Sequence, residues 1–181
     1  MNKLELTDAL IGLGWRAGKD EVGEFFFTRN IDSVRVQLLP QIAKRPDYFR
    51  FSLNPSVSTD DFSAAISLIS GEKTDFEPII VGNEIPKKIT QITTHTVHEL
   101  SDQVIFWARN QNIDQGLEML RNLPADSKGA FPLRHLAALS LAGDVEILRL
   151  YQRSFSAGDR CGFVPYITAQ AINRALEIAN R

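Results

Sequence analysis

Two histidines that stand three residues apart are the first feature of the sequence that suggests chemistry. His95 and His98 lie in the stretch TTHTVHEL, and Glu99 follows directly. Paired histidines on one face of a helix can bind a transition metal when further side chains complete the site, and Asp102 or His135 would be the candidates. The order His-x-x-His-Glu matches neither the metalloprotease motif His-Glu-x-x-His nor the inverted motif His-x-x-Glu-His. We therefore expect no metal and no cofactor, and we keep a metal-dependent hydrolase as an alternative.

The other reactive side chains of the sequence also lack the neighbours that catalysis needs. Cys161 follows Arg160, which is the kind of residue that activates a thiolate, but no general base can be named beside it. The adjacent carboxylates Asp60 and Asp61 would point to opposite faces of a strand, which is unsuited to paired acid and base work. The chain also contains no G-x-S-x-G elbow and no phosphate-binding glycine loop. We therefore expect a protein that is not an enzyme.

Composition limits the classes of partner and the compartment. The 181 residues include 20 Lys and Arg against 22 Asp and Glu, so the net charge of −2 provides no basic field for nucleic acid. A single cysteine cannot form an internal disulfide, which favours a reducing compartment. The first residues, MNKLELTDALIGLGW, do not read as a signal peptide, and no apolar run reaches the ~18 residues of a membrane helix. We expect a cytoplasmic protein that binds neither membrane nor nucleic acid directly.

Hydrophobic periodicity predicts strands in the first half of the chain and helices in the second. Alternating apolar residues predict an antiparallel pair of strands around residues 25–28 and 34–38, and a third strand over 49–53. Residues 62–68 also alternate, so we predict a fourth strand there, and PIIVGNEIP suggests a short edge strand. Helical spacing predicts helices in the following places: residues 4–13, 97–108, 113–123, 133–141, 145–151 and 168–179.

This order of elements is typical of a segregated α+β fold. We predict an N-terminal helix and an antiparallel β-meander of about four to five strands over residues 1–92, followed by a helical subdomain over residues 93–181. The two parts would form a single domain of residues 1–181. The phenylalanines of the strands could stack bases on an open sheet, but alternation on one face is more typical of a core that the helices cover.

The organisation of the whole chain resembles that of the immunity proteins of bacterial contact-dependent growth inhibition systems. Three features carry the resemblance: LTDALIGLGWRAGKDEVGEFFFTRNIDSVRVQLLP, then YFRFSLNPSVSTDDFSAAISLIS, then the helical C-terminal half. The resemblance implies a small cytosolic protein without enzymatic activity that binds and neutralises a cognate toxin, often a nuclease. The first half is also similar to the plan of type III secretion chaperones, so a secretion-type chaperone or adaptor is a second hypothesis.

A toxin inhibitor needs complementary shape and charge rather than a reactive group. If the toxin is a basic nuclease domain, an acidic surface should face it. The candidate partner-binding residues are the acidic side chains between the predicted strands and helices: Asp60, Asp61, Glu72, Asp75 and Glu77. Aromatic anchors would add to such a contact if they are exposed, and Trp15, Tyr48 and Phe76 are candidates. The sequence leaves the oligomeric state open.

Overall fold

The hairpin predicted from alternating phenylalanines and valines is present. Strand β2 (Phe25–Ile31) pairs antiparallel with β3 (Val34–Leu38), and Ile31 lies opposite Val34. Asp32, in the tight turn between them, has a positive φ of 53°. Phe27, Val36 and Leu38 are almost completely buried. The alternation of the sequence therefore places one face of this hairpin in a core.

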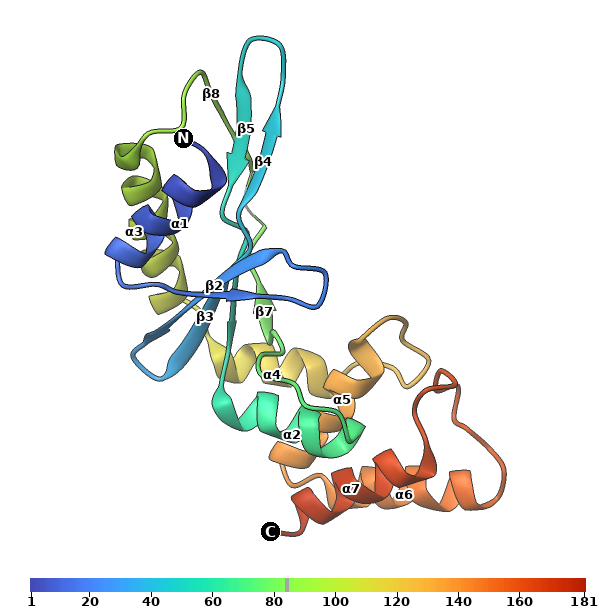
Figure 1. Cartoon of the computed structure of the whole chain (residues 1–181). Helices are drawn as coiled ribbons and strands as arrows, with labels where there is room; N and C mark the ends of the chain where they lie inside the picture. Colours follow the sequence, from blue (N-terminus) through green and yellow to red (C-terminus); the bar gives the residue numbers. More distant parts are fainter. Residues whose placement is uncertain (84) are drawn as a thin grey trace. The chain divides into compact units, whose positions relative to one another are not determined.

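The computed structural model describes residues 1–83 and 85–181, and they form two compact units (Figure 1). Unit 1 contains Met1–Val57 and Ile80–Gln111, and unit 2 contains Ser58–Ile79 and Asn112–Arg181. The chain therefore passes from one unit to the other three times. The expected boundary at residues 92 and 93 does not coincide with this division, because one helix from each half of the chain belongs to the other unit.

Unit 1 contains two antiparallel sheets. The five-stranded sheet has the order β1-β2-β3-β6-β7, and the three-stranded sheet has the order β4-β5-β8. The remaining strands are β1 (Arg16–Lys19), β4 (Gln41–Lys44), β5 (Phe49–Ser52), β6 (Pro55–Ser58), β7 (Ile80–Val81) and β8 (Lys87–Ile89). The structure thus contains more strands than the predicted meander of four to five, and they are divided between two sheets.

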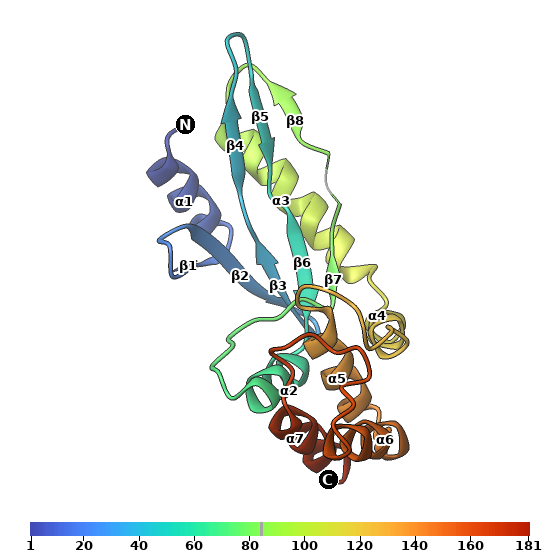
Figure 2. The same cartoon turned by 90° about the vertical axis from the view of Figure 1, so that its right-hand side faces the viewer.

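Two continuous stretches of extended chain connect the sheets, because each bends from one sheet into the other (Figure 2). Strand β3 continues into β4 through Leu39 and Pro40, and β5 continues into β6 through Leu53 and Asn54. At the bend the Leu39 N–H donates to the Leu53 carbonyl at 2.8 Å, and the Asn54 side chain donates to the Leu39 carbonyl at 3.1 Å. Strand β2 pairs with β3 but not with β4, so β4 forms the edge of the three-stranded sheet.

Two helices lie side by side on one face of unit 1: α1 (Lys3–Gly12) and α3 (Thr94–Arg109) (Figures 1 and 2). Helix α1 begins with a capping box, in which the Asn2 side chain accepts from the Glu5 N–H and the Glu5 side chain accepts from the Asn2 N–H. Trp15, only 2% exposed, donates its indole N–H to the Ser101 hydroxyl at 2.9 Å. This buried hydrogen bond connects the end of the α1 segment to α3.

The prediction of a strand over residues 62–68 is wrong, because these residues belong to helix α2 (Asp60–Ser70). The Thr59 side chain caps the helix by accepting from the Phe62 N–H, and two acidic residues follow in the first turn, where they interact favourably with the helix dipole. Gly71 ends the helix with a left-handed φ of 79°. The buried residues Phe62, Ile66 and Ile69 recur at helical spacing, whereas Leu68 is exposed.

Unit 2 consists of α2 and two helix hairpins (Figure 1). The first hairpin is α4 (Ile113–Arg121) with α5 (Phe131–Leu141), and the second is α6 (Val145–Ser156) with α7 (Ala169–Ala179). Helices α5 and α7 pack against each other and against α2, and α4 and α6 lie outside them. The helices predicted from apolar periodicity in this region are therefore confirmed, with small shifts of their ends.

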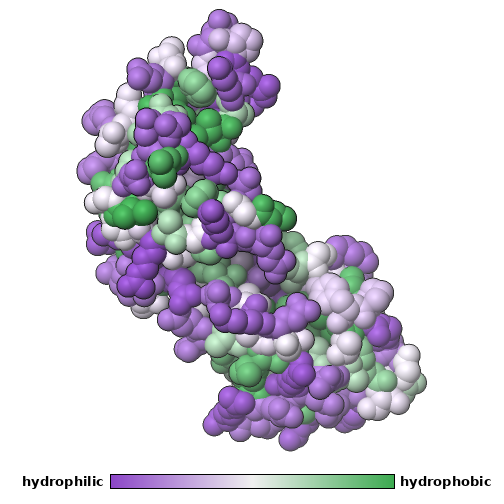
Figure 3. All heavy atoms as spheres, viewed as in Figure 1, coloured by the Kyte–Doolittle hydropathy of each residue, from purple (hydrophilic) through white to green (hydrophobic). Residues whose placement is uncertain are grey.

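The predicted fold class is confirmed: an N-terminal helix and antiparallel sheets precede a largely helical C-terminal half. On the face drawn in Figure 3, apolar residues form small groups among hydrophilic ones. Among the described residues, no helix has both the length and the apolar composition that crossing a membrane requires.

Candidate functional site

Two loops of unit 2 contact each other, and both belong to helix hairpins. Residues 122–130 join α4 to α5, and residues 157–168 join α6 to α7. The Tyr166 hydroxyl donates to the carbonyl of Gly129, which connects the two loops directly. A Cβ at Gly162 would lie 2.9 Å from the Asp126 Cβ, so the approach of the loops requires a glycine, which also has a φ of 82°. Loops held by a rigid helical scaffold are a common location for binding surfaces.

Arg160 organises the longer loop from within. Its guanidinium donates to the carbonyl of Val164 at 2.8 Å and to that of Ile167 at 2.7 Å. The Asp159 side chain accepts from the Cys161 N–H at 2.9 Å, and Cys161 has a positive φ of 52°. Arg160 therefore stabilises the loop backbone, and Cys161 lies at a tight turn in the same loop.

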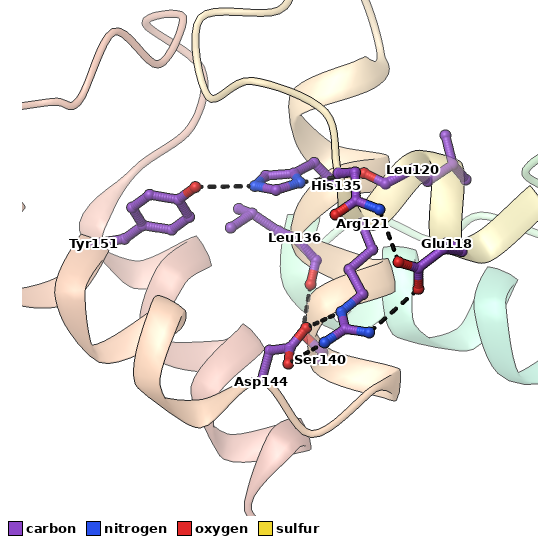
Figure 4. Close-up of polar contacts among 9 residues, drawn as sticks. Glu118, Leu120, Arg121, His135, Leu136, Ser140, Asp144 and Tyr151 are labelled. Atoms are coloured by element: carbon purple, nitrogen blue, oxygen red, sulfur yellow. Dashed lines mark hydrogen bonds and ion pairs between the residues drawn. The ribbon is translucent and has the colours of Figure 1, made fainter.

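A buried histidine of α5 bonds to residues of α4 and α6 (Figure 4). One ring nitrogen of His135, Nδ1, is 3.2 Å from the Leu120 carbonyl, and the other, Nε2, is 3.0 Å from the Tyr151 hydroxyl. A carbonyl only accepts, so Nδ1 carries the proton and Nε2 accepts from the tyrosine. Phe163 of the longer loop packs edge-on against Tyr151, with their ring centroids 5.0 Å apart. The histidine thus connects the end of α4 to α6 and, through Tyr151, to the loop.

A second polar cluster connects the same end of α4 to the start of α6 (Figure 4). The Arg121 guanidinium makes two hydrogen bonds to the Asp144 carboxylate, one of them 2.8 Å long, and a third to Glu118 at 3.2 Å. The hydrogen bonds to Asp144 raise the pKa of Arg121 above its ordinary value. Because Asp144 precedes α6, this paired contact fixes the α5–α6 turn to the end of α4.

The buried histidine predicts a pH dependence of stability. Burial lowers the pKa of His135 below its ordinary value of about 6.5, although the Leu120 carbonyl and Asp144 act in the opposite direction. The unfolded chain then binds the proton more readily, so stability is complete above the unfolded pKa and decreases as the pH falls below it toward the folded pKa. We expect the urea midpoint of unit 2 to be lower at pH 5.5 than at pH 7.5.

The variant His135→Gln can keep both hydrogen bonds without titrating, so the difference in midpoint between the two pH values should become smaller. His98→Gln is the matched control, since His98 is exposed on α3, and it should leave the difference unchanged. Equal pH dependence in the wild type and in His135→Gln would contradict this assignment.

The start of α5, the longer loop and the segment after α2 form a surface that we call the loop face: Glu77, Phe131, Arg134 and Tyr166. Phe131 is 47% exposed and Tyr166 is 50% exposed. Arg134 lies over the Phe131 ring, 5.6 Å from its centroid, and its guanidinium pairs with the Glu77 carboxylate. Partial burial raises the pKa of the Tyr166 hydroxyl above its usual range. The loop face therefore combines two exposed rings with an arginine whose position is fixed.

The acidic residues predicted to bind a partner all lie on α2 or on the segment that follows it. Asp60 and Asp61 lie in the first turn of α2, and Glu72 lies just past its end. The returning segment is bonded to the helix, because the Glu77 N–H donates to the Ser63 hydroxyl at 3.2 Å.

Two of these acidic side chains are engaged in ion pairs. Asp75 pairs with Lys73 at 3.2 Å, and Glu77 pairs with Arg134. Only Glu77 of the predicted set belongs to the loop face.

The histidine motif of α3 lies on the exposed side of that helix in unit 1. His95 Nε2 is 3.6 Å from Glu99, and His98 Nδ1 is 3.2 Å from Asp102. His135, the third histidine, belongs to unit 2. Within residues 1–83 and 85–181, no group of three or more His, Cys, Asp or Glu side chains lies close enough together to hold a metal ion. The two histidines therefore form separate pairs with the carboxylates one turn further along the helix.

The aromatic candidates from the sequence are less exposed than the rings of the loop face. Trp15 is buried, and Tyr48 and Phe76 are partly buried. Sequence reasoning missed Phe131, Arg134 and Tyr166 because none of them belongs to a motif, and Phe131 and Tyr166 lie outside the predicted helices. An aromatic residue next to proline and glycine in a loop was the available signal, but it does not reveal that the two loops meet.

The comparisons with known proteins concern the chain as a whole. A model of a family of unknown function, DUF6990, matches residues 2–180. The chain belongs to the DUF6990 family. The DUF6990 match spans both units, so the sheets and the helix hairpins are both part of it. No curated protein and no solved structure was found to be similar to this DUF6990 chain.

Proposed function

We propose that this chain binds and neutralises a cognate protein toxin, and that the loop face contributes the main contact. The observation that carries the proposal is the pair of half-exposed rings, Phe131 and Tyr166, with Arg134 lying over the Phe131 ring. Aromatic residues and arginine are enriched among the residues that dominate binding energy at protein interfaces. The choice of a toxin as the partner rests on the resemblance to immunity proteins of growth-inhibition systems.

The rigidity of the loop face supports a role in binding. Arg134 is held by Glu77, and the Tyr166 hydroxyl is held by Gly129, so their side chains lose little conformational freedom when a partner binds. Arg160 holds the longer loop from within, and His135 bonds to Leu120 next to the start of the shorter loop. Ordering side chains on binding costs free energy, and this cost is smaller for a surface that is already ordered.

Charge supports a basic partner such as a nuclease domain. The residues of unit 2 include 12 Asp and Glu and 9 Lys and Arg, so its formal charge is 9 − 12 = −3. Five of these acidic residues lie on α2 or on the segment that follows it, and Glu77 of that segment pairs with Arg134 of the loop face. An acidic surface steers a basic partner toward the binding site and speeds association. The inhibitor would occupy the active site or the substrate surface of the toxin in the cytoplasm, and no reactive group is needed.

The test is co-expression with the product of the neighbouring reading frame. We expect that protein to stop growth when it is expressed alone, to allow growth when this chain is present, and to co-purify with it. Phe131→Ala combined with Tyr166→Ala should weaken the complex at least about 30-fold, since even one residue of this kind contributes about 2 kcal/mol or more when it anchors an interface. Calorimetry of the purified pair measures the affinity.

Phe106→Ala is the matched control, because Phe106 is a 71% exposed phenylalanine on α3 of unit 1. It should leave affinity and growth rescue unchanged. If the two proteins do not associate and growth is not rescued, the toxin proposal is wrong. If they associate and the loop-face variant binds as tightly as the wild type, the contact lies on another surface.

A further inference from the structure

We propose that the free edge of β4 in unit 1 binds an extended, acidic segment of a partner protein by strand addition. This interaction would be separate from the loop face, which belongs to unit 2. It therefore does not depend on the toxin proposal.

The register of the β4–β5 hairpin shows which backbone groups point outward. The Arg45 N–H donates to the Tyr48 carbonyl at 2.8 Å, so Arg45 and Tyr48 form a hydrogen-bonded pair. In an antiparallel ladder such pairs alternate with non-hydrogen-bonded ones. The register places Ala43 opposite Arg50 and Ile42 opposite Phe51, so Ala43 bonds to β5 while the N–H and C=O groups of Ile42 and Lys44 point away from it. These groups can pair with one more strand.

The strand is accessible as well as unpaired at its outer edge. All four residues of β4 are exposed, and within the described strands β4 is the outermost in the order β4-β5-β8. Pro40 and Pro46 lie on either side of it, so an added strand could extend the ladder only over these few residues. Figure 2 shows the hairpin of β4 and β5 with α3 along one face, and Figure 3 shows that the tip of the hairpin is mostly hydrophilic.

The charge of the three-stranded sheet selects the chemistry of the added strand. The residues of β4, β5 and β8 include four basic side chains and no acidic one: Lys44, Arg50, Lys87 and Lys88. This sign is opposite to that of unit 2. A second copy of the same edge would place like charges side by side, which is a common way in which natural proteins prevent edge-to-edge pairing. The same charges favour a strand that carries carboxylates.

The exposed face of the sheet is arranged to receive those carboxylates. Ala43, Arg50 and Lys88 lie in one cross-strand row, and Arg50 and Lys88 are both exposed. Lys88 lies over the Tyr48 ring, 5.6 Å from its centroid, which places its charge on this face. The backbone of an added strand would lie about 10 Å from that of Arg50, which is two strand spacings. Because the Ala43 side chain between them is small, it would not block a contact between a glutamate of the added strand and Arg50. An extended arginine and an extended glutamate can bridge this distance.

A designed peptide tests the proposal directly. The probe is Thr-Glu-Val-Glu-Val-Glu-Thr, blocked at both ends, which places its glutamates on one face and its valines on the other. We expect the peptide to bind and to protect the amides of Ile42 and Lys44 from hydrogen exchange. The Ile42→Pro variant removes an outward donor without removing a hydrogen bond to β5, and it should weaken binding at least tenfold. Reversal of charge in Arg50→Glu with Lys88→Glu should do the same, even if the proline variant does not fold.

The controls separate strand addition from simple attraction of anions. The same peptide with N-methyl groups on alternate residues keeps its charge but cannot extend the ladder, so it should not bind. Lys128→Glu in unit 2 is the matched charge variant and should leave binding unchanged. The proposal is overturned if the amides of Ile42 and Lys44 gain no protection at millimolar peptide, or if the N-methylated peptide binds equally well. It is also overturned if a single-stranded oligothymidylate binds more tightly than the peptide and Ile42→Pro has no effect on either.

Discussion

Replacing Trp15 by alanine is expected to lower the free energy of unfolding of unit 1 by about 3–5 kcal/mol, the cost typical of a buried aromatic residue. Trp15 is 2% exposed, so the substitution removes a large apolar side chain and leaves a cavity. It also removes the indole N–H that donates to the Ser101 hydroxyl at 2.9 Å, and Ser101 is only 1% exposed. Urea unfolding followed by circular dichroism and by the fluorescence of Trp107 measures the loss.

Two further variants divide this loss into its parts. Trp15→Phe keeps most of the packing and should cost less than the alanine variant. Ser101→Ala keeps the ring but leaves a buried indole N–H without its acceptor, for which we expect about 1–3 kcal/mol. Phe106→Ala, on the exposed side of the same helix, is the control and should change stability by about 0.5 kcal/mol or less. A loss below about 1 kcal/mol for Trp15→Ala would show that this contact contributes little to unit 1.

Replacing Phe62 by alanine is expected to lower the free energy of unfolding of unit 2 by a similar amount, about 3–5 kcal/mol. Phe62 is completely buried on the side of α2 that packs against α5 and α7. Its loss would open a cavity at the centre of unit 2, where three helices meet. Hydrogen exchange of the α5 and α7 amides, together with urea unfolding, measures the effect on this unit.

Leu68→Ala is the matched control on the same helix, since Leu68 is 49% exposed. In a strand, residues 62 and 68 would lie on the same face, and both substitutions would be costly. In a helix they lie on different sides, so Leu68→Ala should cost about 1 kcal/mol or less. Similar losses for the two variants would contradict the helical register of α2.

The failure of the strand prediction over residues 62–68 has a physical origin. Phe62 and Ile66 are four residues apart, a spacing that fits both the period of a strand and that of a helix. Ala64 is apolar yet exposed, and it completed an apparent alternation without contributing to a core. The capping signals, Thr59 with two acidic residues after it, were present and proved the more informative.

The β2–β3 hairpin and the C-terminal helices were predictable because the apolar pattern of their own residues determines their secondary structure. Each has a strongly periodic apolar pattern that only one kind of element can bury. The short strands β1, β4, β6 and β8 were not predicted. Arg16–Lys19 and Lys87–Ile89 have no such pattern, and they are strands because they pair with β2 and β5. Pairing between distant segments is a property of the fold that local sequence does not encode.

The same limit applies to the loop face. Phe131 and Tyr166 are far apart in the sequence, and each alone resembles an ordinary loop residue. They come together because Tyr166 bonds to Gly129 and because Gly162 allows the loops to approach. The acidic residues near α2 could be recognised in sequence, since they cluster within 18 positions, from 60 to 77. Their ion pairs with Lys73 and Arg134 could not.

The passage of the chain between the two units limits how the protein can be cut. Residues 58–79 leave unit 1 at β6 and return at β7, and Val57 and Ile80 face each other in the same ladder. The segment 58–79 therefore leaves and re-enters unit 1 at neighbouring positions, where the Cα atoms of paired residues are about 5 Å apart. A fragment that begins at Asn112 would lack α2 and would leave the sides of α5 and α7 that it covers open to water. Grafting residues 58–79 onto the front of that fragment would restore the missing helix, and a short turn in their place would close the gap in the remainder.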